Sequence, residues 1–213
     1  MTEREIVSRL REEYFDILPA ARRAITKIET EIRYHTLEIH QRLKPHEQLL
    51  VRARIKECQS AIDSARRRGN RGKSEGKVFD PERSTDYSIL SLPDLAGVRV
   101  LVFPDRRLGE VDKVLREHFS GWRSDPIMNS ETGVVLAQKY DGKLDVDKDK
   151  ISAEYQVVPM LLGLYWEVEH SARYKSVLKE SEKMFELNTQ VETALSNFEK
   201  GIADLLPDNS DLD

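Results

Sequence analysis

Two carboxylates lie beside short apolar segments of the chain, where they could hold a metal ion. Asp94 comes just before the apolar run GVRVLVF (97–103), and Glu154 lies within SAEYQVV (152–158). Because Mg²⁺ is commonly bound by one or two carboxylates together with substrate phosphates, these residue types suit phosphate chemistry. Arg99 lies inside the first run, where an arginine is costly unless it is paired. The alternative is that Asp94 caps a turn and Arg99 points outward by strand alternation.

A basic cluster precedes these segments. Residues 52–77 contain nine basic and three acidic side chains, although the whole chain has a formal net charge of −4. Local positive charge of this kind attracts anions, and arginine and lysine are the usual phosphate ligands. Ser60 follows Lys56 by four residues, so a helix would place both on one face. The alternative is a solvated helix face followed by a charged loop. The basic residues are Arg52, Arg54, Lys56, Arg66, Arg67, Arg68, Arg71, Lys73 and Lys77.

A third polar group lies further along the chain. Glu154 and Gln156 are two residues apart in a strand pattern, so both side chains face the same side of a sheet. Glu169 and His170 follow in the helical segment YWEVEHSARYK, and one of them could face the end of that sheet. A lone histidine on a helix is more often structural than catalytic, and that alternative stays open.

Helices at both ends and strands between them would position these groups. A capping box at Thr2 and Glu5 begins the first helix, and Pro19 suits the first turn of a second. The segment 69–87, rich in glycine, serine and charge, reads as a mobile loop. The expected helices cover 2–17, 19–44, 46–68, 106–119, 159–175 and 176–205. The expected strands cover 97–103, 134–140 and 152–158, with a turn at Asp141-Gly142.

This order of elements predicts an α+β fold with a small mixed β-sheet flanked by helices. With 213 residues and 39% hydrophobic composition, the chain is expected to form a globular core. Cys58 is the single cysteine, so no internal disulfide can form. No apolar run approaches the roughly 20 residues that span a bilayer, and no targeting segment is visible. We therefore expect a soluble cytoplasmic protein with no membrane partner.

The order of these motifs resembles the synthetase domain of the RelA/SpoT family. The motifs are Arg-x-Lys-x-x-x-Ser from Arg54, Asp-Leu-Ala-Gly-Val-Arg-Val from Asp94, Glu-x-Gln from Glu154, and Trp-x-x-Glu-His-x-x-x-Tyr-Lys from Trp166. The resemblance covers roughly residues 50–178 and is closest to the small single-domain members. It implies the nucleotidyltransferase-like fold of that family and an ATP- and Mg²⁺-dependent transfer of pyrophosphate to a ribose 3′-hydroxyl.

The resemblance also implies roles for the basic residues. Arg54 and Lys56 would hold the phosphates of ATP. Ser60, Arg66 and Arg99 would belong to the same anion site. Positioning and charge neutralisation supply most of the catalysis in phosphoryl-type transfer, so a cluster of cations is what this chemistry needs.

The acidic and amide residues take the remaining roles. By resemblance Asp94 would bind Mg²⁺, and Glu154 would be either a metal-linked acid or the base at the acceptor hydroxyl. Gln156, Glu169 and His170 would shape the pocket.

Three departures from the family pattern concern mainly the acceptor half. Ser64 stands where the family has a second basic residue four positions after the serine, with Arg66, Arg67 and Arg68 nearby. The sequence Val-Val-Pro follows Glu-x-Gln in place of Ile-Arg-Thr, which removes an arginine. The acceptor motif Tyr-Arg-Ser-x-His, whose tyrosine stacks on guanine, has no counterpart in SETGVVLAQKY (130–140). Tyr140 and Tyr155 are possible replacements that lie outside the pattern.

The sequence thus favours a pyrophosphokinase-like enzyme with an altered acceptor, and a catalytically inactive nucleotide-binding or regulatory relative is the alternative. A helical scaffold with accidental similarity is a remote third. Expected partners are ATP and an acceptor such as GDP, GTP or the end of a tRNA, while a homo-oligomer stays open. We expect an N-terminal helical extension (1–48), a synthetase-like domain (49–178), and a C-terminal helix with an acidic tail (179–213).

Overall fold

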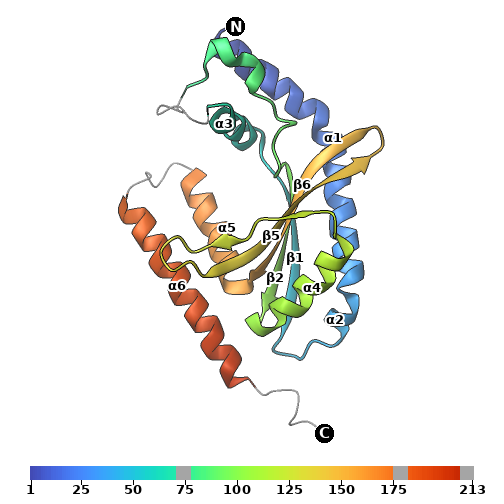
Figure 1. Ribbon diagram of the computed structural model, residues 1–213, viewed down its shortest axis with the longest axis vertical. Helices are drawn as coiled ribbons and strands as arrows, with labels where there is room; N and C mark the ends of the chain where they lie inside the picture. Colours follow the sequence, from blue (N-terminus) through green and yellow to red (C-terminus); the bar gives the residue numbers. More distant parts are fainter. Residues whose placement is uncertain (71–77, 175–181, 207–213) are drawn as a thin grey trace.

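The computed structural model describes residues 1–70, 78–174 and 182–206, and it shows a mixed β-sheet between two layers of helices (Figure 1). The strand order is β1-β2-β6-β5-β3, and β4 pairs with β5. β2 and β6 are parallel, whereas the other paired strands are antiparallel. The strands are β1 (Gln48–Ile55), β2 (Ala96–Phe103), β3 (Arg123–Ser124), β4 (Ile127–Met128), β5 (Val135–Val146) and β6 (Asp149–Pro159). The predicted α+β class with a small mixed sheet is confirmed.

Helices cover both faces of this sheet. One face packs on α1 and α4, and the other packs on α5, with α6 outside α5 (Figure 1). None of the helices that the structure describes is both long and apolar enough to cross a membrane. The α-helices are α1 (Glu3–His35), α2 (Leu37–Gln41), α3 (Cys58–Gly69), α4 (Leu108–His118), α5 (Met160–Tyr174) and α6 (Glu182–Leu205), with short 3₁₀ turns η1 (Pro81–Asp86) and η2 (Asp105–Arg107).

The main core lies between α1, α4 and one face of the sheet. Every second residue of the central strands faces it, because side chains alternate along a strand. Val98, Val100 and Val102 of β2 are at most 2% exposed, and Tyr155 of β6 is fully buried among them. A second cluster joins the first half of α1 to α3 through Leu10 and its neighbours.

The first helix differs from the prediction because it is continuous through Pro19. Its capping box forms as expected, with Glu5 N donating to Thr2 Oγ1 at 3.3 Å. A proline inside a helix leaves the carbonyl four residues earlier without its partner. Here Pro19 and Phe15 are both exposed, so water can satisfy that carbonyl. Buried residues on both sides of Pro19, from Ile6 to Ile32, hold the two halves of α1 in line.

The predicted helix over 46–68 is wrong in its first half. Residues Gln48–Ile55 form β1, which pairs with β2 along its whole length, and only Cys58–Gly69 is helical. Leu49 and Val51 face the core while Arg52 and Arg54 face away, which is the two-residue period of a strand. Pairing with the apolar β2 therefore outweighed the helical preference of a charged segment.

The hairpin turn is also displaced from the predicted Asp141-Gly142. β5 continues to Val146, which pairs with Asp149, so the two-residue turn is Asp147-Lys148. Asp147 adopts a φ of 55°, a left-handed conformation that aspartate tolerates. Gly142 instead lies inside the strand under the Trp122 ring, where a Cβ would come within 2.2 Å. The predicted strands 97–103, 134–140 and 152–158 and the helix over 106–119 are otherwise confirmed.

Candidate functional site

Strand register brings the predicted polar residues together on the face of the sheet that looks towards α5. Arg54 of β1 pairs with Gly97 of β2, and Gly97 pairs with Glu154 of β6. The adjacent row consists of Arg52, Arg99 and Gln156 in the same strand order. Side chains two residues apart share a face, so the two rows form one polar surface.

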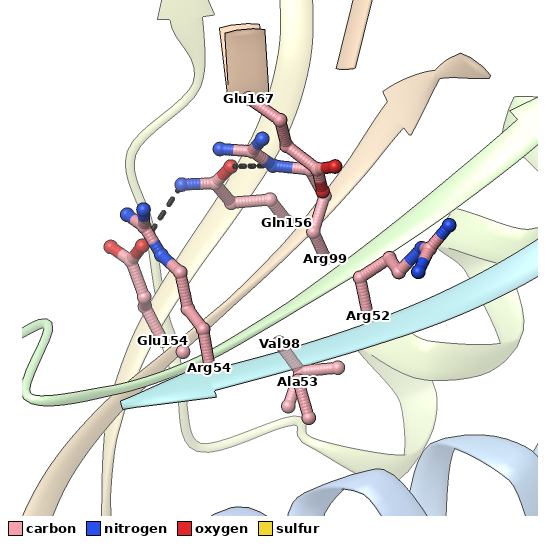
Figure 2. A pocket seen from close by; sticks show the side chains of 9 residues that line it. Arg52, Ala53, Arg54, Val98, Arg99, Glu154, Gln156 and Glu167 are labelled. Carbon is pink, nitrogen blue, oxygen red and sulfur yellow. Dashed lines mark hydrogen bonds between the residues drawn. The ribbon is translucent and has the colours of Figure 1, made fainter. Parts of the chain in front are cut away.

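A cavity of about 200 Å³ opens over these two rows. Gly97 keeps its floor open, because a Cβ there would lie 3.6 Å from Glu154 Cγ and would fill the space between Arg54 and Glu154. Figure 2 shows the polar side chains projecting into this space, whereas Ala53 and Val98 point the other way. The lining residues are Arg52, Ala53, Arg54, Gly97, Val98, Arg99, Glu154, Gln156 and Glu167.

Gln156 fixes the two charged groups beside it. Its Nε2 donates to Glu154 Oε1 at 2.9 Å, and its Oε1 accepts from Arg99 Nε at 3.1 Å (Figure 2). Arg99 also donates to the Gly163 carbonyl at 3.2 Å, and its guanidinium lies 5.7 Å from the centre of the Trp166 ring. The arginine inside the apolar strand is therefore paired, and strand alternation directs it into the cavity.

Burial gives Glu154 the character of a base. Only 8% of Glu154 is exposed, and loss of hydration raises the pKa of its carboxyl, with the charge of Asp94 as the next cause. A carboxylate with a raised pKa accepts a proton more readily than an ordinary glutamate. The pKa of Arg99 is lowered by burial first and by Arg54 second, yet an arginine stays charged under all ordinary conditions.

Lys56 and Asp94 lie together beyond the end of β1. The Lys56 ammonium forms a short ion pair with the Asp94 carboxylate, and Lys56 N donates to the Leu95 carbonyl at 3.0 Å. The Lys56 carbonyl in turn accepts from Tyr14 Oη at 2.9 Å, which ties this turn to α1. The negative charge of Asp94 is the second cause, after burial, that raises the pKa of Glu154. That the two carboxylates share one ion stays a prediction.

Ser60 and Arg66 lie on α3 and not on the strand that carries Arg54. Ser60 is buried at 5% exposure in the first turn of that helix. Arg66 pairs with Asp63 at 3.1 Å, and its guanidinium lies 5.8 Å from the centre of the Phe79 ring. Because β1 replaces the expected helix, the argument that Lys56 and Ser60 share a helical face is wrong. Their role in an anion site stays a prediction.

The helix α5 contributes a different carboxylate from the one expected. Glu167 lines the cavity, whereas Glu169 accepts a hydrogen bond from Asn188 Nδ2 of α6 at 3.2 Å. The His170 side chain lies outside the described residues, and so do Arg71, Lys73 and Lys77 of the expected loop over 69–87. No spacing in the sequence distinguishes Glu167 from Glu169, because the contact that turns Glu167 towards the cavity is made only in the folded chain. Arg52 could have been found from strand alternation with Arg54.

Charged pairs continue the two rows onto β5. Asp141 pairs in register with Glu154, and Lys139 pairs with Gln156. Across the edge, Arg123 lies 2.9 Å from Asp141 and Lys139 lies 2.6 Å from Asp125. Within the part of the chain that the structure describes, the other oxygen of Asp141, Oδ1, is buried without a hydrogen-bond partner. The side of the site formed by β5 and β6 thus carries the carboxylates of Asp141 and Glu154, while the β1 side carries arginines.

Comparison with known proteins shows a likeness in structure alone. No protein-family model matches the sequence, and no curated protein matches it either. The fold is similar to that of the small alarmone synthetase 1 from Bacillus subtilis bound to AMPCPP, at 16% identity and a TM-score of 0.62, over 90% of this chain and 96% of that one. The same protein bound to its product pppGpp gives 17% identity and a TM-score of 0.65, over 91% and 96%.

A second solved relative has the same fold. A GTP pyrophosphokinase family protein from Streptococcus pneumoniae is 20% identical, with a TM-score of 0.61 over 90% of this chain and 93% of that one. These likenesses span nearly the whole of each chain. The chain therefore has the fold of the small alarmone synthetases, as the RelA/SpoT resemblance of its motifs predicts.

Proposed function

We propose that the chain is an ATP-dependent nucleotide pyrophosphokinase, which moves the β,γ-pyrophosphate of ATP to the 3′-hydroxyl of a nucleotide and releases AMP. The observation that carries the proposal is the cavity in which Arg52, Arg54 and Arg99 face the buried Glu154. Structural neighbours with the same fold hold AMPCPP and pppGpp, which supports nucleotide ligands here. A cationic wall beside a base with a raised pKa is what such a transfer needs.

The residues have separate tasks in this proposal. Arg52, Arg54 and Arg99 bind the phosphates and neutralise the charge that builds up during transfer. Glu154 accepts the proton of the 3′-hydroxyl while the hydroxyl oxygen bonds to the β-phosphorus of ATP. The bond between the β-phosphorus and the bridging α,β-oxygen breaks at the same time, and AMP leaves with that oxygen. Gln156 holds Glu154 in place through the 2.9 Å hydrogen bond. Lys56 adds positive charge near the far end of β1.

The residue types suit a magnesium ion. Asp94 and Glu154 offer carboxylate oxygens, the ligands that Mg²⁺ prefers. The ion pair of Asp94 with Lys56 does not exclude a metal, because a carboxylate has about four lone-pair sites. When bound, Mg²⁺ supplies charge neutralisation at the phosphate oxygens. We propose Asp94 as its protein ligand. Glu154 would be a second ligand only in place of its role as the base, because a metal-bound carboxylate is a poor proton acceptor.

The acceptor is the less defined half of the proposal. Residues 130–140, where the family motif is expected, run from the connection between β4 and β5 into β5, and Tyr140 is their single aromatic residue. Tyr140 and Tyr155 do not replace the missing ring, because both are buried in the core on the other face of the sheet. We therefore expect weak activity on GDP and GTP, since stacking on an aromatic ring is worth about 1–3 kcal/mol per base.

A transfer assay separates the enzyme from an inactive binding module. The full chain is incubated with γ-labelled ATP, Mg²⁺ and a panel of nucleotides and tRNA. We expect labelled product from the parent chain, with Asp94→Asn and Glu154→Gln each lowering kcat far more than ATP affinity. Glu38→Gln on α2 and Asp145→Asn near the hairpin are exposed control changes that should leave the rate intact. No transfer to any acceptor, with nucleotide binding unaffected by Glu154→Gln, would favour the inactive module.

A further inference from the structure

Two histidines and a glutamate converge where the C-terminal ends of α1 and α4 meet, on the side of the sheet away from the cavity. Glu31 Oε2 lies 3.6 Å from His35 Nε2 and 3.1 Å from His118 Nε2. Glu31 and His35 are four residues apart and share one face of α1, while His118 is the last residue of α4. The three ligand atoms all lie within 4.8 Å of one another.

The two separations between Glu31 and the histidine nitrogens match the spacing of ligands around a tetrahedral metal ion. Zinc binds imidazole nitrogen and carboxylate oxygen at about 2.0–2.2 Å, so two of its ligand atoms lie about 3.4 Å apart. The distances of 3.1 and 3.6 Å from Glu31 to the two ring nitrogens lie on either side of that value. The set of two histidines and one glutamate leaves a fourth position for water, as open zinc sites do.

The surrounding rings hold the two imidazoles in this arrangement. The His35 and His118 rings stack with centres 3.7 Å apart and planes 29° apart. Tyr34 packs edge-on against His35, and Phe119 packs edge-on against His118. Phe119 is 7% exposed and belongs to the main core, so the backbone next to His118 is held in place by core packing. This packing confines both rings to one small region, and binding of an ion would require the two stacked rings to open towards it.

We propose that Glu31, His35 and His118 bind one transition-metal ion of the zinc class and so tie the end of α1 to the end of α4. Imidazole selects Zn²⁺, Co²⁺ or Ni²⁺ over Mg²⁺, which separates this site from the carboxylates of the cavity. The side chains are 38%, 30% and 29% exposed, which leaves a path for the ion from solvent. The proposal does not depend on the transfer reaction.

Zinc titration of the full chain tests the site directly. Chelator-treated protein without a polyhistidine tag is titrated with Zn²⁺ against a chromophoric chelator, and we expect one ion per chain and a higher Tm with zinc. Changing even the outer partners of a metal ligand costs about 10–100-fold in affinity, so loss of a ligand should cost about 100-fold or more. We expect Glu31→Gln and His118→Gln each to reach that loss, and Co²⁺ to give a visible absorption band that His118→Gln abolishes.

Matched variants exclude other sources of binding. His40→Gln removes an exposed imidazole on the neighbouring helix α2, and Cys58→Ser removes the single thiol. Both should bind zinc as tightly as the parent chain. A parent chain that binds no zinc at micromolar concentrations overturns the proposal, and so does equal binding by folded Glu31→Gln and His118→Gln. Either result would reduce the cluster to a pair of glutamate–histidine contacts.

Discussion

A buried glutamate between α5 and α6 should make the stability of the chain depend on pH. Glu199 is fully buried on α6, and its Oε1 accepts the Leu161 N–H at the start of α5 at 3.1 Å. Its other oxygen has no hydrogen-bond partner among the described residues. Burial is the main cause that raises the pKa of Glu199 from 4.5 to about 7, while the backbone N–H groups of α5 act in the opposite direction.

The sign and size of the effect follow from that pKa. Because the folded state holds the proton more tightly than the unfolded chain, the contribution of Glu199 to stability is largest below pH 4.5 and falls as the pH rises towards 7. At about 1.4 kcal/mol per pKa unit, the full loss is about 3 kcal/mol. Above the folded pKa the loss is complete and the curve levels off.

The variant Glu199→Gln removes the titration and keeps an oxygen that can accept the Leu161 N–H. We expect it to gain up to about 3 kcal/mol over the parent chain at pH 8 and almost nothing at pH 4.5. Urea unfolding at pH 4.5, 5.5, 6.5, 7.5 and 8 measures that difference. Glu186→Gln, an exposed change on the same helix, should show no such trend. A Glu199→Gln effect that is constant from pH 4.5 to 8 would refute the reasoning.

Two further perturbations test the packing and the basic loop. Gly142→Ala should cost about 1–3 kcal/mol of unfolding free energy by overpacking, since its Cβ would lie 2.2 Å from the Trp122 ring, while Gly121→Ala, with nothing within 4 Å, should not. Equal stability of the two variants in thermal unfolding would contradict the packing argument. Neutralising Arg71, Lys73 and Lys77 together should weaken ATP binding more at low salt than at high salt. Unchanged binding at low salt would make that segment a plain linker.

The apolar strands were predictable because their patterns are strong and local. GVRVLVF combines β-branched residues with a proline on each side, and it forms β2 over Ala96–Phe103. β1 was missed because Leu50 interrupts its alternation and its charges suit a helix. The long β5–β6 hairpin was cut short because Asp141-Gly142 is a strong turn signal, whereas the glycine is needed beneath Trp122. In both places a contact made by tertiary structure outweighs a local preference.

Part of the candidate site was visible in the sequence for a related reason. Arg99, Glu154 and Gln156 stand at alternate positions of recognisable strands, so their common face follows from the two-residue period. Glu167 lies on a helix whose rotation about its axis is set by Gly163, where a Cβ would meet Leu101 at 2.2 Å. Spacing along the chain carries no information about that contact and therefore does not distinguish Glu167 from Glu169.

The position of β6 in the sheet sets the order in which the chain can assemble. β6 is the last strand to be synthesised, yet it lies between β2 and β5 in the middle of the sheet. Until it is made, β2 carries an unpaired edge rich in valine, and such an edge invites association with other chains. Its parallel pairing with β2 also closes a long loop, which is a slow step. A nascent or truncated chain ending before Asp149 would thus have the arginines of the cavity but neither the central strand of the sheet nor Glu154 opposite them, and it should be prone to aggregation.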